Sequence, residues 1–407
     1  MEKFQPPRGT RDLLPAEMAA REALFSRLRG VFRSYGYGEV WTPAFEDFDL
    51  LARKSGPDIE QELYVFTDKA GRKLGLRFDP TVPICRIVAS SPNLPKPMRF
   101  CYLTNMWRYD RPQKGRWREF WQAGVELLGS PRPEADAEVL AVAADCMRAA
   151  GLKRFAFRVN SRTAVEALAK EAGIPEGKKA DALRALDKLA KVGKAGVEKE
   201  LQEKGIPRAK AEAFLGLVGQ EGGRTDPGIA RITELLKEMG ITNVRHDPSV
   251  VRGIDYYTGF VFETMVEGHE DLGSVASGGR YDTLVGLYGG GEVPATGFGM
   301  GIDRVMEILG TGKAPVPHLL VAPVREELAG NALSLAGELR ARGVACEAEV
   351  MGRSLRKQLE YANSRGIPHL LFVGEKELKA GAYTLRDMQT GKEQQLSLEA
   401  VAKQLRG

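Results

Sequence analysis

The apolar and polar positions of the first 150 residues follow two periods in turn. Apolar residues three and four positions apart, such as Leu24, Leu28 and Phe32, predict a helix over residues 16–35. The same spacing predicts further helices at 47–54, 84–89 and 134–151. Between the helices, residue-by-residue alternation predicts a short strand within 36–46 and a hairpin with arms 62–67 and 73–78.

The longest alternating stretch, residues 99–129, predicts a second hairpin with arms 99–109 and 117–128. Its loop, DRPQKGR, is basic and carries the proline that a strand would exclude. Because side chains alternate along a strand, one face of the second arm looks like core: Glu119, Trp121, Ala123, Val125 and Leu127. The other face carries Phe120, Gln122, Gly124 and Glu126.

That second face has two interpretations. A half-buried strand routinely turns a polar face to water. An aromatic ring, an amide, a glycine gap and a carboxylate, with Arg108 near the end of the opposing strand, could instead hold a flat base, a phosphate and a small polar molecule. The chain on either side has to decide between the two.

Residues 161–240 change character, being rich in Ala, Lys and Glu and poor in aromatic residues. They predict four or five helices broken at GIP, GIP and DP, that is, a compact helical insertion whose charged faces lie in water. Strand patterns precede it at 155–159 and return at 244–246 and 250–267. A glycine-rich strand at 295–300 then leads into a helix at 302–309.

From residue 318 onward, apolar strands alternate with amphipathic helices. This order predicts an α/β domain of about 90 residues with a mainly parallel sheet, large enough to fold alone. We therefore divide the chain into residues 1–316, which include the helical insertion at about 161–240, and residues 317–407.

Composition narrows the class of protein. The 407 residues are 43% hydrophobic and 28% charged, with a net charge of +5, which suits a globular protein and allows a polyanionic partner. The four cysteines and four histidines are scattered, so we expect neither a disulfide framework nor a protein cage for a metal. No signal-like segment and no run of 18 apolar residues occurs, so we expect a cytoplasmic protein without a membrane span.

Two further clusters join the hairpin as candidate chemistry. Arg252-Gly253-Ile254-Asp255-Tyr256-Tyr257 places an arginine and two tyrosines in an otherwise apolar strand, where burial requires polar partners. In GFGMGIDR the alternate glycines clear one strand face, and Arg304 lies in the first turn of the following helix. Neither a dinucleotide fingerprint nor a P-loop is present. Arg108 and Arg304 together suggest a nucleoside triphosphate held at both ends.

At this point a family resemblance is plain. The Pro43 region, the Arg108 hairpin and GFGMGIDR resemble the three signature motifs of class II aminoacyl-tRNA synthetases. VVRGIDYYTGFVFE and SGGRYD resemble the two signatures of the histidyl-tRNA synthetase family, which GTRDLLP and LRFDPTVP also match. The resemblance implies an α+β catalytic domain on an antiparallel sheet and a C-terminal α/β anticodon-binding domain. It covers nearly the whole chain, with the helical insertion as the unspecific part.

The resemblance also implies an activity. A histidine–tRNA ligase activates L-histidine with ATP to histidyl-adenylate and transfers it to the 3′ end of tRNA(His), with Mg²⁺ accompanying the ATP phosphates. The family works as a homodimer, so the implied partners are tRNA(His), L-histidine, ATP and a second copy of the chain.

The implied site residues fall into four groups. Arg108 and Arg252 would be catalytic, and Arg108, Phe120 and Arg304 would bind ATP. Lys114 and Arg116 would meet the tRNA acceptor end. Histidine would be bound by Asp79, Pro80, Thr81, Arg108, Gln122, Glu126, Arg252, Tyr256, Tyr257 and Tyr281.

Two departures and three rivals stay open. Asp79 stands where some members of the family carry Glu, and Ser277 stands where a third glycine is frequent. The rivals are the regulatory paralogue of histidine biosynthesis (an ATP phosphoribosyltransferase regulatory subunit), a class II synthetase for threonine, proline or glycine, and a non-catalytic tRNA-binding protein. An intact C-terminal domain and RGIDYYTG argue against the first two, and three arginines suited to phosphates argue against the third.

Overall fold

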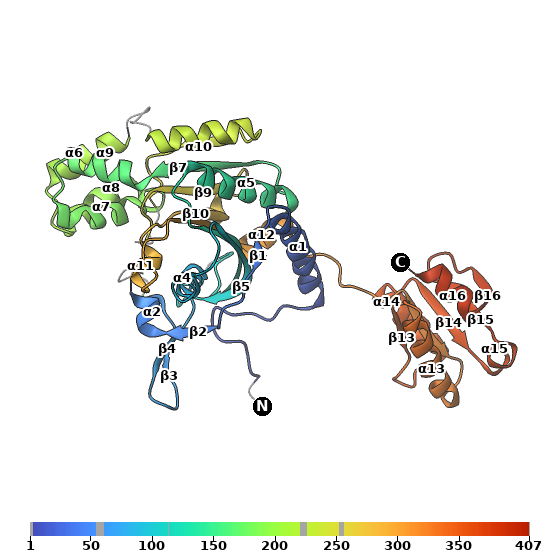
Figure 1. Cartoon of the computed structure of the whole chain (residues 1–407). Coiled ribbons are helices and arrows are strands. Elements are labelled where there is room, and N and C mark those ends of the chain that lie inside the picture. The colour runs from blue at the N-terminus through green and yellow to red at the C-terminus, as the bar shows by residue number, and fades with distance from the viewer. Residues whose placement is uncertain (1–2, 54–60, 113, 220–225, 252–255, 407) are drawn as a thin grey trace. The chain divides into compact units, whose positions relative to one another are not determined.

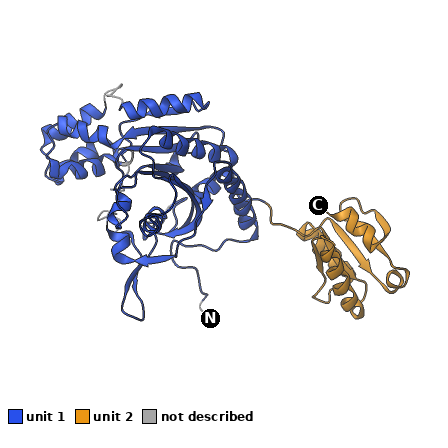
Figure 2. Cartoon of the chain, in the orientation of Figure 1, with its two compact units in different colours: residues 1–312 blue, residues 313–407 orange. Residues whose placement is uncertain are grey.

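The computed structural model describes residues 3–53, 61–112, 114–219, 226–251 and 256–406. The chain forms two compact units, residues 1–312 and residues 313–407, which are coloured separately in Figure 2. Each unit has its own sheet and its own core, and each is described by itself below.

Unit 1 is built on an eight-stranded sheet in the order β1-β5-β6-β11-β10-β9-β7-β8 (Figure 1). Its centre, from β5 to β7, is antiparallel, while β1 and β8 at the edges run parallel to their neighbours. The expectation of an antiparallel catalytic sheet is therefore confirmed. The strands are Gly38–Glu39 (β1), Met98–Trp107 (β5), Glu119–Leu128 (β6), Phe155–Ser161 (β7), Val244–His246 (β8), Phe260–Val266 (β9), Ala276–Arg280 (β10) and Ala295–Gly301 (β11).

Helices cover the two faces of this sheet differently. The larger core packs Ala123, Val125 and Leu127 of β6 against apolar side chains of α1 (Pro15–Ser34), α5 (Pro133–Ala149), α10 (Pro227–Glu238) and α12 (Ile302–Leu309). This confirms which face of the second hairpin arm is core. Figure 1 shows α4 (Thr81–Ala89) within the curve of the sheet, on the opposite side from α1 and α5. A smaller core lies on that inner side and includes Ile84, Tyr102 and Tyr281.

A small three-stranded sheet adjoins the main one. Its order is β2-β4-β3, with strands Phe45–Asp47 (β2), Val65–Thr67 (β3) and Lys73–Leu76 (β4). The antiparallel pair β3–β4 confirms the first predicted hairpin, and α2 (Phe48–Ala52) confirms the short helix after β2. In Figure 1 the β3–β4 hairpin extends from the lower edge of unit 1.

The helical region after β7 has a core of its own. It contains α6 (Arg162–Glu171), the turn η1 (Glu176–Lys178), α7 (Lys179–Leu186), α8 (Leu189–Glu203) and α9 (Arg208–Val218). Figure 1 shows these helices gathered at the left of unit 1. Helix α10 also falls within 161–240, but Ile229, Ile232 and Leu236 join the sheet's larger core, because its apolar face packs on α5.

The predicted strand over residues 250–267 is too long. Strand β9 begins only at Phe260, and Tyr256 and Tyr257 lie in a turn before it. Their rings lie side by side with centroids 4.8 Å apart, whereas neighbours on a strand would point to opposite faces. The turn thus lets two consecutive tyrosines face the same space.

Two short elements lie in the glycine-rich region between β9 and β11. The elements are the turn η2 (Glu270–Leu272) and α11 (Leu284–Leu287).

Unit 2 is an α/β domain with a five-stranded sheet in the order β13-β12-β14-β15-β16. Its first three strands are parallel, and β15 and β16 are antiparallel, so the sheet is mixed rather than parallel throughout. Helix α15 (Glu375–Ala380) was not predicted. The other elements are β12 (Leu319–Pro323), η3 (Glu326–Leu328), α13 (Ala329–Ala341), β13 (Cys346–Ala348), α14 (Leu355–Arg365), β14 (His369–Val373), β15 (Ala382–Asp387), β16 (Glu393–Ser397) and α16 (Leu398–Leu405).

Two expectations from the composition concern membrane spans and disulfide bonds. Among the described residues, no helix is long and apolar enough to span a membrane. The four cysteines, Cys85, Cys101, Cys146 and Cys346, are buried free thiols.

Candidate active site

A polar pocket opens on the inner side of the sheet, where the strands β5, β6, β10 and β11 lie next to the start of α4. It is lined by Asp79, Pro80, Thr81, Tyr102, Arg108, Gln122, Glu126, Tyr256, Tyr257, Ser277, Tyr281, Gly297, Phe298 and Gly299. The pocket therefore brings together residues that are more than 200 positions apart in the sequence.

Glycines on the neighbouring strand make room for the pocket's central carboxylate. Gly297 of β11 pairs with Glu126 of β6. A Cβ atom at Gly297 would lie 1.8 Å from Oε2 of Glu126, so any other residue would occupy the carboxylate's place. The alternate glycines of GFGMG thus let a side chain of this protein, as well as a ligand, approach the strand.

Glu126 is the most deeply held of these groups. Its side chain is 1% exposed; Thr81 Oγ1 donates to Oε1 at 2.6 Å, and the Tyr281 hydroxyl donates to Oε2. Burial disfavours the charged form and raises the pKa of Glu126 to about 8, against the opposing effect of the two hydrogen bonds.

Asp79 supplies a second buried carboxylate. It precedes α4, and its Oδ1 accepts a hydrogen bond from the Val82 amide at 3.1 Å. Its Oδ2 lies 3.4 Å from the Tyr256 hydroxyl, which donates to it. Burial raises the pKa of Asp79, although Arg108 nearby acts in the opposite direction. Buried carboxyl groups of this kind can pair with a ligand that carries its own positive charge.

Arg108 marks the end of the pocket nearest the hairpin loop. It directly follows β5, and its Nε donates to the carbonyl oxygen of Phe78 at 3.1 Å. The guanidinium carbon lies 5.4 Å from the centre of the Phe120 ring. Phe120 itself does not line the pocket but extends the same face beyond it, so a flat group stacked on Phe120 would lie beside the Arg108 charge.

Arg304 lies outside the pocket lining but next to the last glycine of β11, since a Cβ atom at Gly301 would lie 3.8 Å from Cδ of Arg304. It is in the first turn of α12, and its Nη1 donates to the carbonyl oxygen of Ser274. Gly115 of the hairpin loop packs against it, because a Cβ atom there would lie 3.3 Å from Cγ of Arg304. The hairpin loop and Arg304 are therefore neighbours.

The predicted site residues are thus distributed over three places. Nine line the pocket: Asp79, Pro80, Thr81, Arg108, Gln122, Glu126, Tyr256, Tyr257 and Tyr281. Phe120 and Arg304 lie beyond its loop end. Lys114 and Arg116 lie in the loop, at 3.5 Å from Asp271 and 3.6 Å from Asp110 respectively. Arg252 falls outside the described residues.

Tyr102 is a pocket residue that the sequence analysis missed. It lies on β5 opposite Gly124, and its hydroxyl donates to the carbonyl oxygen of Phe298 at 3.1 Å. The gap expected at Gly124 is therefore filled, since a Cβ atom there would lie 2.5 Å from the Tyr102 hydroxyl. A bulky residue paired with a glycine across a predicted hairpin is the signal that could have identified it.

This arrangement suits a small zwitterion. A buried carboxylate such as Asp79 can receive an ammonium group, and Arg108 can hold a carboxylate or phosphate oxygen. Glu126, fixed by Thr81 and Tyr281, presents a hydrogen-bonding carboxyl group to a polar side chain.

Comparison with known proteins agrees with this geometry. Residues 9–305 match the protein family described as histidyl-tRNA synthetase. The chain belongs to the histidyl-tRNA synthetase family. Residues 318–407 match the family described as an anticodon binding domain. The fold is thus that of a class II aminoacyl-tRNA synthetase with a C-terminal anticodon-binding domain, as the sequence motifs predicted.

Relatives of this family match along the whole chain. The histidine–tRNA ligase of Thermococcus kodakarensis is 38% identical over 434 aligned residues, which cover 100% of this chain and 99% of the relative. That of Pyrobaculum neutrophilum is 39% identical and covers 96% of both chains. The crystal structure of histidyl-tRNA synthetase from Nostoc sp. PCC 7120 aligns with a TM-score of 0.79 at 25% identity, over 100% of this chain and 99% of that one.

The regulatory rival has less support. A Bacillus halodurans structure described as an ATP phosphoribosyltransferase regulatory subunit/histidyl-tRNA synthetase aligns with a TM-score of 0.73 at 27% identity. It covers 89% of this chain and 97% of that one. The curated relatives that match this chain over 96–100% of its length are instead named histidine–tRNA ligases. The anticodon binding domain is also present.

Proposed function

We propose that this chain is a histidine–tRNA ligase that uses the pocket for L-histidine and the hairpin face beyond it for ATP. The observation that carries the proposal is the buried carboxyl group of Glu126, held by Thr81 and Tyr281 in a pocket that Arg108 also lines. A carboxyl group in that place can pair with a nitrogen of an imidazole ring, and the pocket's polar lining penalises apolar side chains.

The reaction has two steps. An oxygen of the histidine carboxylate forms a bond to the α-phosphorus of ATP, the bond from that phosphorus to the β-phosphate oxygen breaks, and pyrophosphate leaves. A hydroxyl group of the terminal tRNA ribose then attacks the carbonyl carbon of histidyl-adenylate, and AMP leaves. Neither step needs a nucleophile from the protein, so the protein contributes orientation and electrostatic stabilisation.

The proposed roles follow the chemistry of each residue. Arg108 holds the α-phosphate and the histidine carboxylate, Phe120 stacks on adenine, and Arg304 holds the γ-phosphate. Asp79, Thr81 and Gln122 bind the backbone groups of histidine, and Glu126, Tyr257 and Tyr281 surround its side chain. Arg252, outside the described residues, keeps the role that its motif implies, stabilising charge that develops at the α-phosphorus.

Mg²⁺ would accompany the ATP phosphates. Among the described residues, no three Asp, Glu, His or Cys side chains come together to hold a metal ion. Mg²⁺ bound mainly through phosphate oxygens and water fits such a site, and it would neutralise phosphate charge.

We also propose a homodimer. Four apolar side chains on or beside the small sheet are exposed: Trp41 (74%), Phe45 (51%), Val65 (42%) and Phe66 (40%). The Phe45 and Phe66 rings meet edge to face at 6.0 Å, so these two exposed rings form one cluster. An exposed apolar cluster of this kind marks a protein interface. Sedimentation of the parent chain and of Phe66→Arg would test it, with a dimer expected only for the parent.

The remaining partner is tRNA(His). The C-terminal unit would contact the anticodon, and Lys114 and Arg116 of the hairpin loop would contact the acceptor end by charge. The four free thiols suit the reducing cytoplasm, where we propose that the protein works.

ATP–pyrophosphate exchange measured with each amino acid in turn tests the proposal. We expect exchange with histidine alone. Absence of histidine-dependent exchange in a folded protein would refute the ligase assignment and favour the regulatory alternative.

A further inference from the structure

The N-terminal segment Pro7–Arg11, called the arm below, lies against the hairpin. Thr10 closes a turn on Pro7, with its amide 3.0 Å and its hydroxyl 2.7 Å from the Pro7 carbonyl oxygen. Gly9 then accepts a hydrogen bond from the Arg118 amide at 2.7 Å. The Arg118 carbonyl in turn accepts the Arg108 amide at 2.9 Å, so two backbone bonds connect the arm to Arg108.

The arm approaches the hairpin closely only because residue 9 is glycine. Gly9 has a φ of +87°, which is strained for other residues. A Cβ atom there would lie 2.8 Å from side-chain carbons of Arg118 and 2.9 Å from Pro112. The Gly9 backbone therefore packs directly against the side chains of Pro112 and Arg118.

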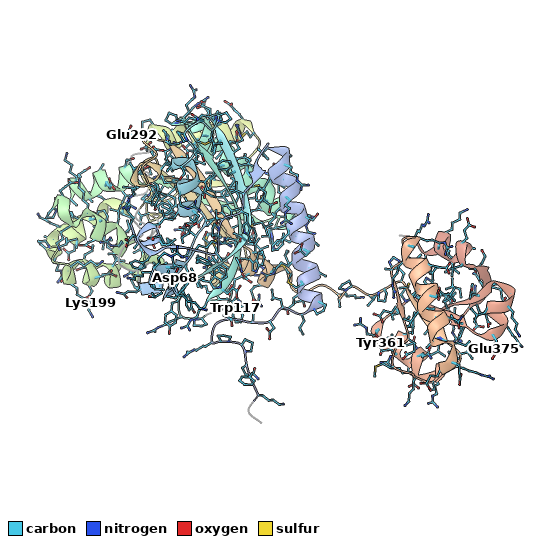
Figure 3. All side chains as sticks on the ribbon, turned by 60° about the horizontal axis from the view of Figure 1, so that its bottom comes forward. Asp68, Trp117, Lys199, Glu292, Tyr361 and Glu375 are labelled. Atoms are coloured by element: carbon cyan, nitrogen blue, oxygen red, sulfur yellow. The ribbon has the colours of Figure 1, made fainter. Side chains whose placement is uncertain are left out.

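Arg11 makes the second contact of the arm. Its guanidinium carbon lies 4.7 Å from the centre of the Trp117 ring, and its Nη2 is 3.0 Å from Oδ1 of Asp303. Trp117, labelled in Figure 3, lies in the connection between the hairpin loop and β6. Arg11 thus connects the hairpin to the start of α12.

Asp303 joins three elements. Its Oδ1 also accepts Nη2 of Arg21 at 2.7 Å, and its Oδ2 accepts the Trp121 amide at 2.8 Å. The backbone pairing between β11 and β6 ends at Gly301 and Gln122. Just beyond that pair, the Asp303 side chain continues the connection between the two segments. Asp303 precedes Arg304, and Trp121 follows Phe120.

The network therefore fixes the distance between the two ends of the proposed ATP site. We infer that Arg11 is a positioning residue, which holds the helix that carries Arg304 against the hairpin that carries Phe120 and Arg108. The inference rests on the proposed function. Trp117, Asp303 and Glu17, which Arg11 contacts, do not line the pocket in which Thr81 and Tyr281 hold Glu126. Removal of Arg11 should consequently weaken the use of ATP and spare that of histidine.

Removing the Arg11 side chain does not leave the buried Asp303 carboxylate without a partner. Arg21, which is 2% exposed, stays paired with Asp303, whereas the Arg11 side chain is 26% exposed. Arg11→Gln should therefore fold. We expect its kcat/KM for ATP in the exchange reaction to fall about tenfold, mainly through KM, with the KM for histidine within twofold of the parent.

Two variants control the experiment. Arg11→Lys keeps the charge for Asp303 but loses the flat group over Trp117, so we expect a threefold loss, and it carries the test alone if Arg11→Gln does not fold. Arg158→Gln removes an ion pair with Asp247 in which the arginine is similarly exposed (27%), on β7 near the other end of the sheet, and it should leave the kinetics unchanged.

Four outcomes decide the matter. A parental KM for ATP in both folded Arg11 variants would overturn the inference, as would an equal rise in the KM for histidine, which indicates general loosening. A selective rise in the KM for ATP supports it. If the parent chain shows no histidine-dependent exchange, the proposed function fails, independently of Arg11.

Discussion

The two ends of the inner sheet face hold their polar groups in different ways. At the pocket end, Glu126 and Asp79 are buried and their carboxyl oxygens are bonded to side-chain hydroxyls. At the loop end, Arg108 and Arg304 donate to backbone carbonyl oxygens. A neutral carbonyl oxygen orients the Arg108 guanidinium without adding a charge of its own. These arrangements fit the proposed roles, in which the pocket end selects the amino acid and the loop end places a polyanion.

The largest effect should come from the pocket end. Glu126→Ala removes the carboxyl group and leaves Thr81 and Tyr281 without their shared acceptor. We expect kcat/KM for histidine to fall about 10³- to 10⁴-fold, because a polar site loses discrimination when its partner is missing. The KM for ATP should change less than threefold. Exchange kinetics with each substrate varied in turn would measure both.

Glu119→Gln is the matched control, since it changes an exposed glutamate on the same strand and the opposite face. Equal losses for histidine and ATP in Glu126→Ala would mean that the two ends are not separate.

The next largest effects should distinguish the role of Arg304 from that of Arg108. Arg304→Ala should lower kcat/KM for ATP about 10²-fold and leave the KM for histidine unchanged, because Arg304 lies outside the pocket lining. Arg108→Ala should impair both substrates, by 10²- to 10³-fold, because Arg108 lines the pocket and also lies beside Phe120. Steady-state exchange distinguishes the patterns. Identical patterns in the two variants would contradict the placement of Arg108 at the boundary.

Stability against pH should report on the buried carboxyl group directly. The pKa of Glu126 is raised from 4.5 to about 8, so the folded chain keeps a proton that the unfolded chain releases above about pH 4.5. The contribution of Glu126 to the free energy of unfolding is therefore greatest below pH 4.5 and declines as pH rises to 8. A difference of one between the folded and unfolded pKa corresponds to about 1.4 kcal/mol, so the loss amounts to several kcal/mol.

Denaturant unfolding between pH 5 and 8 tests this. Glu126→Gln cannot ionise, so its stability should fall less steeply with pH than that of the parent. Asp79, whose pKa is also raised, is present in both proteins and cancels in the comparison. Parallel pH profiles would show that Glu126 is ionised in the folded chain.

The sequence predicted the sheet and its pocket unequally. Period-two alternation identified the core side of β6 correctly, since Ala123, Val125 and Leu127 all join the large core. Helix α12 was predicted at its observed bounds because the glycine-rich strand ends where apolar helical spacing begins. These are local patterns, and local patterns are visible in a single sequence.

What the sequence could not predict depends on contacts between distant residues. The strand over 250–267 was overextended because Tyr256 and Tyr257 look like strand residues, whereas packing turns both toward one pocket. The Arg11–Asp303 bond spans 292 positions, and no periodicity connects its two ends. Tyr102 was missed because its neighbour across the sheet, Gly124, was interpreted as empty space.

Tyr102→Phe should give the smallest effect. It tests whether Tyr102 takes part in selecting histidine at the pocket end. The hydroxyl donates to the Phe298 carbonyl at 3.1 Å and lines the pocket. Losing one hydrogen bond costs about 0.5–1.5 kcal/mol, so we expect the KM for histidine to rise about threefold to tenfold with an unchanged KM for ATP. Tyr288→Phe removes a similar bond, to the Leu50 carbonyl, outside the pocket lining and should alter stability alone. If both variants lose stability and neither changes the KM for histidine, Tyr102 supports the strands without taking part in selection at the pocket end.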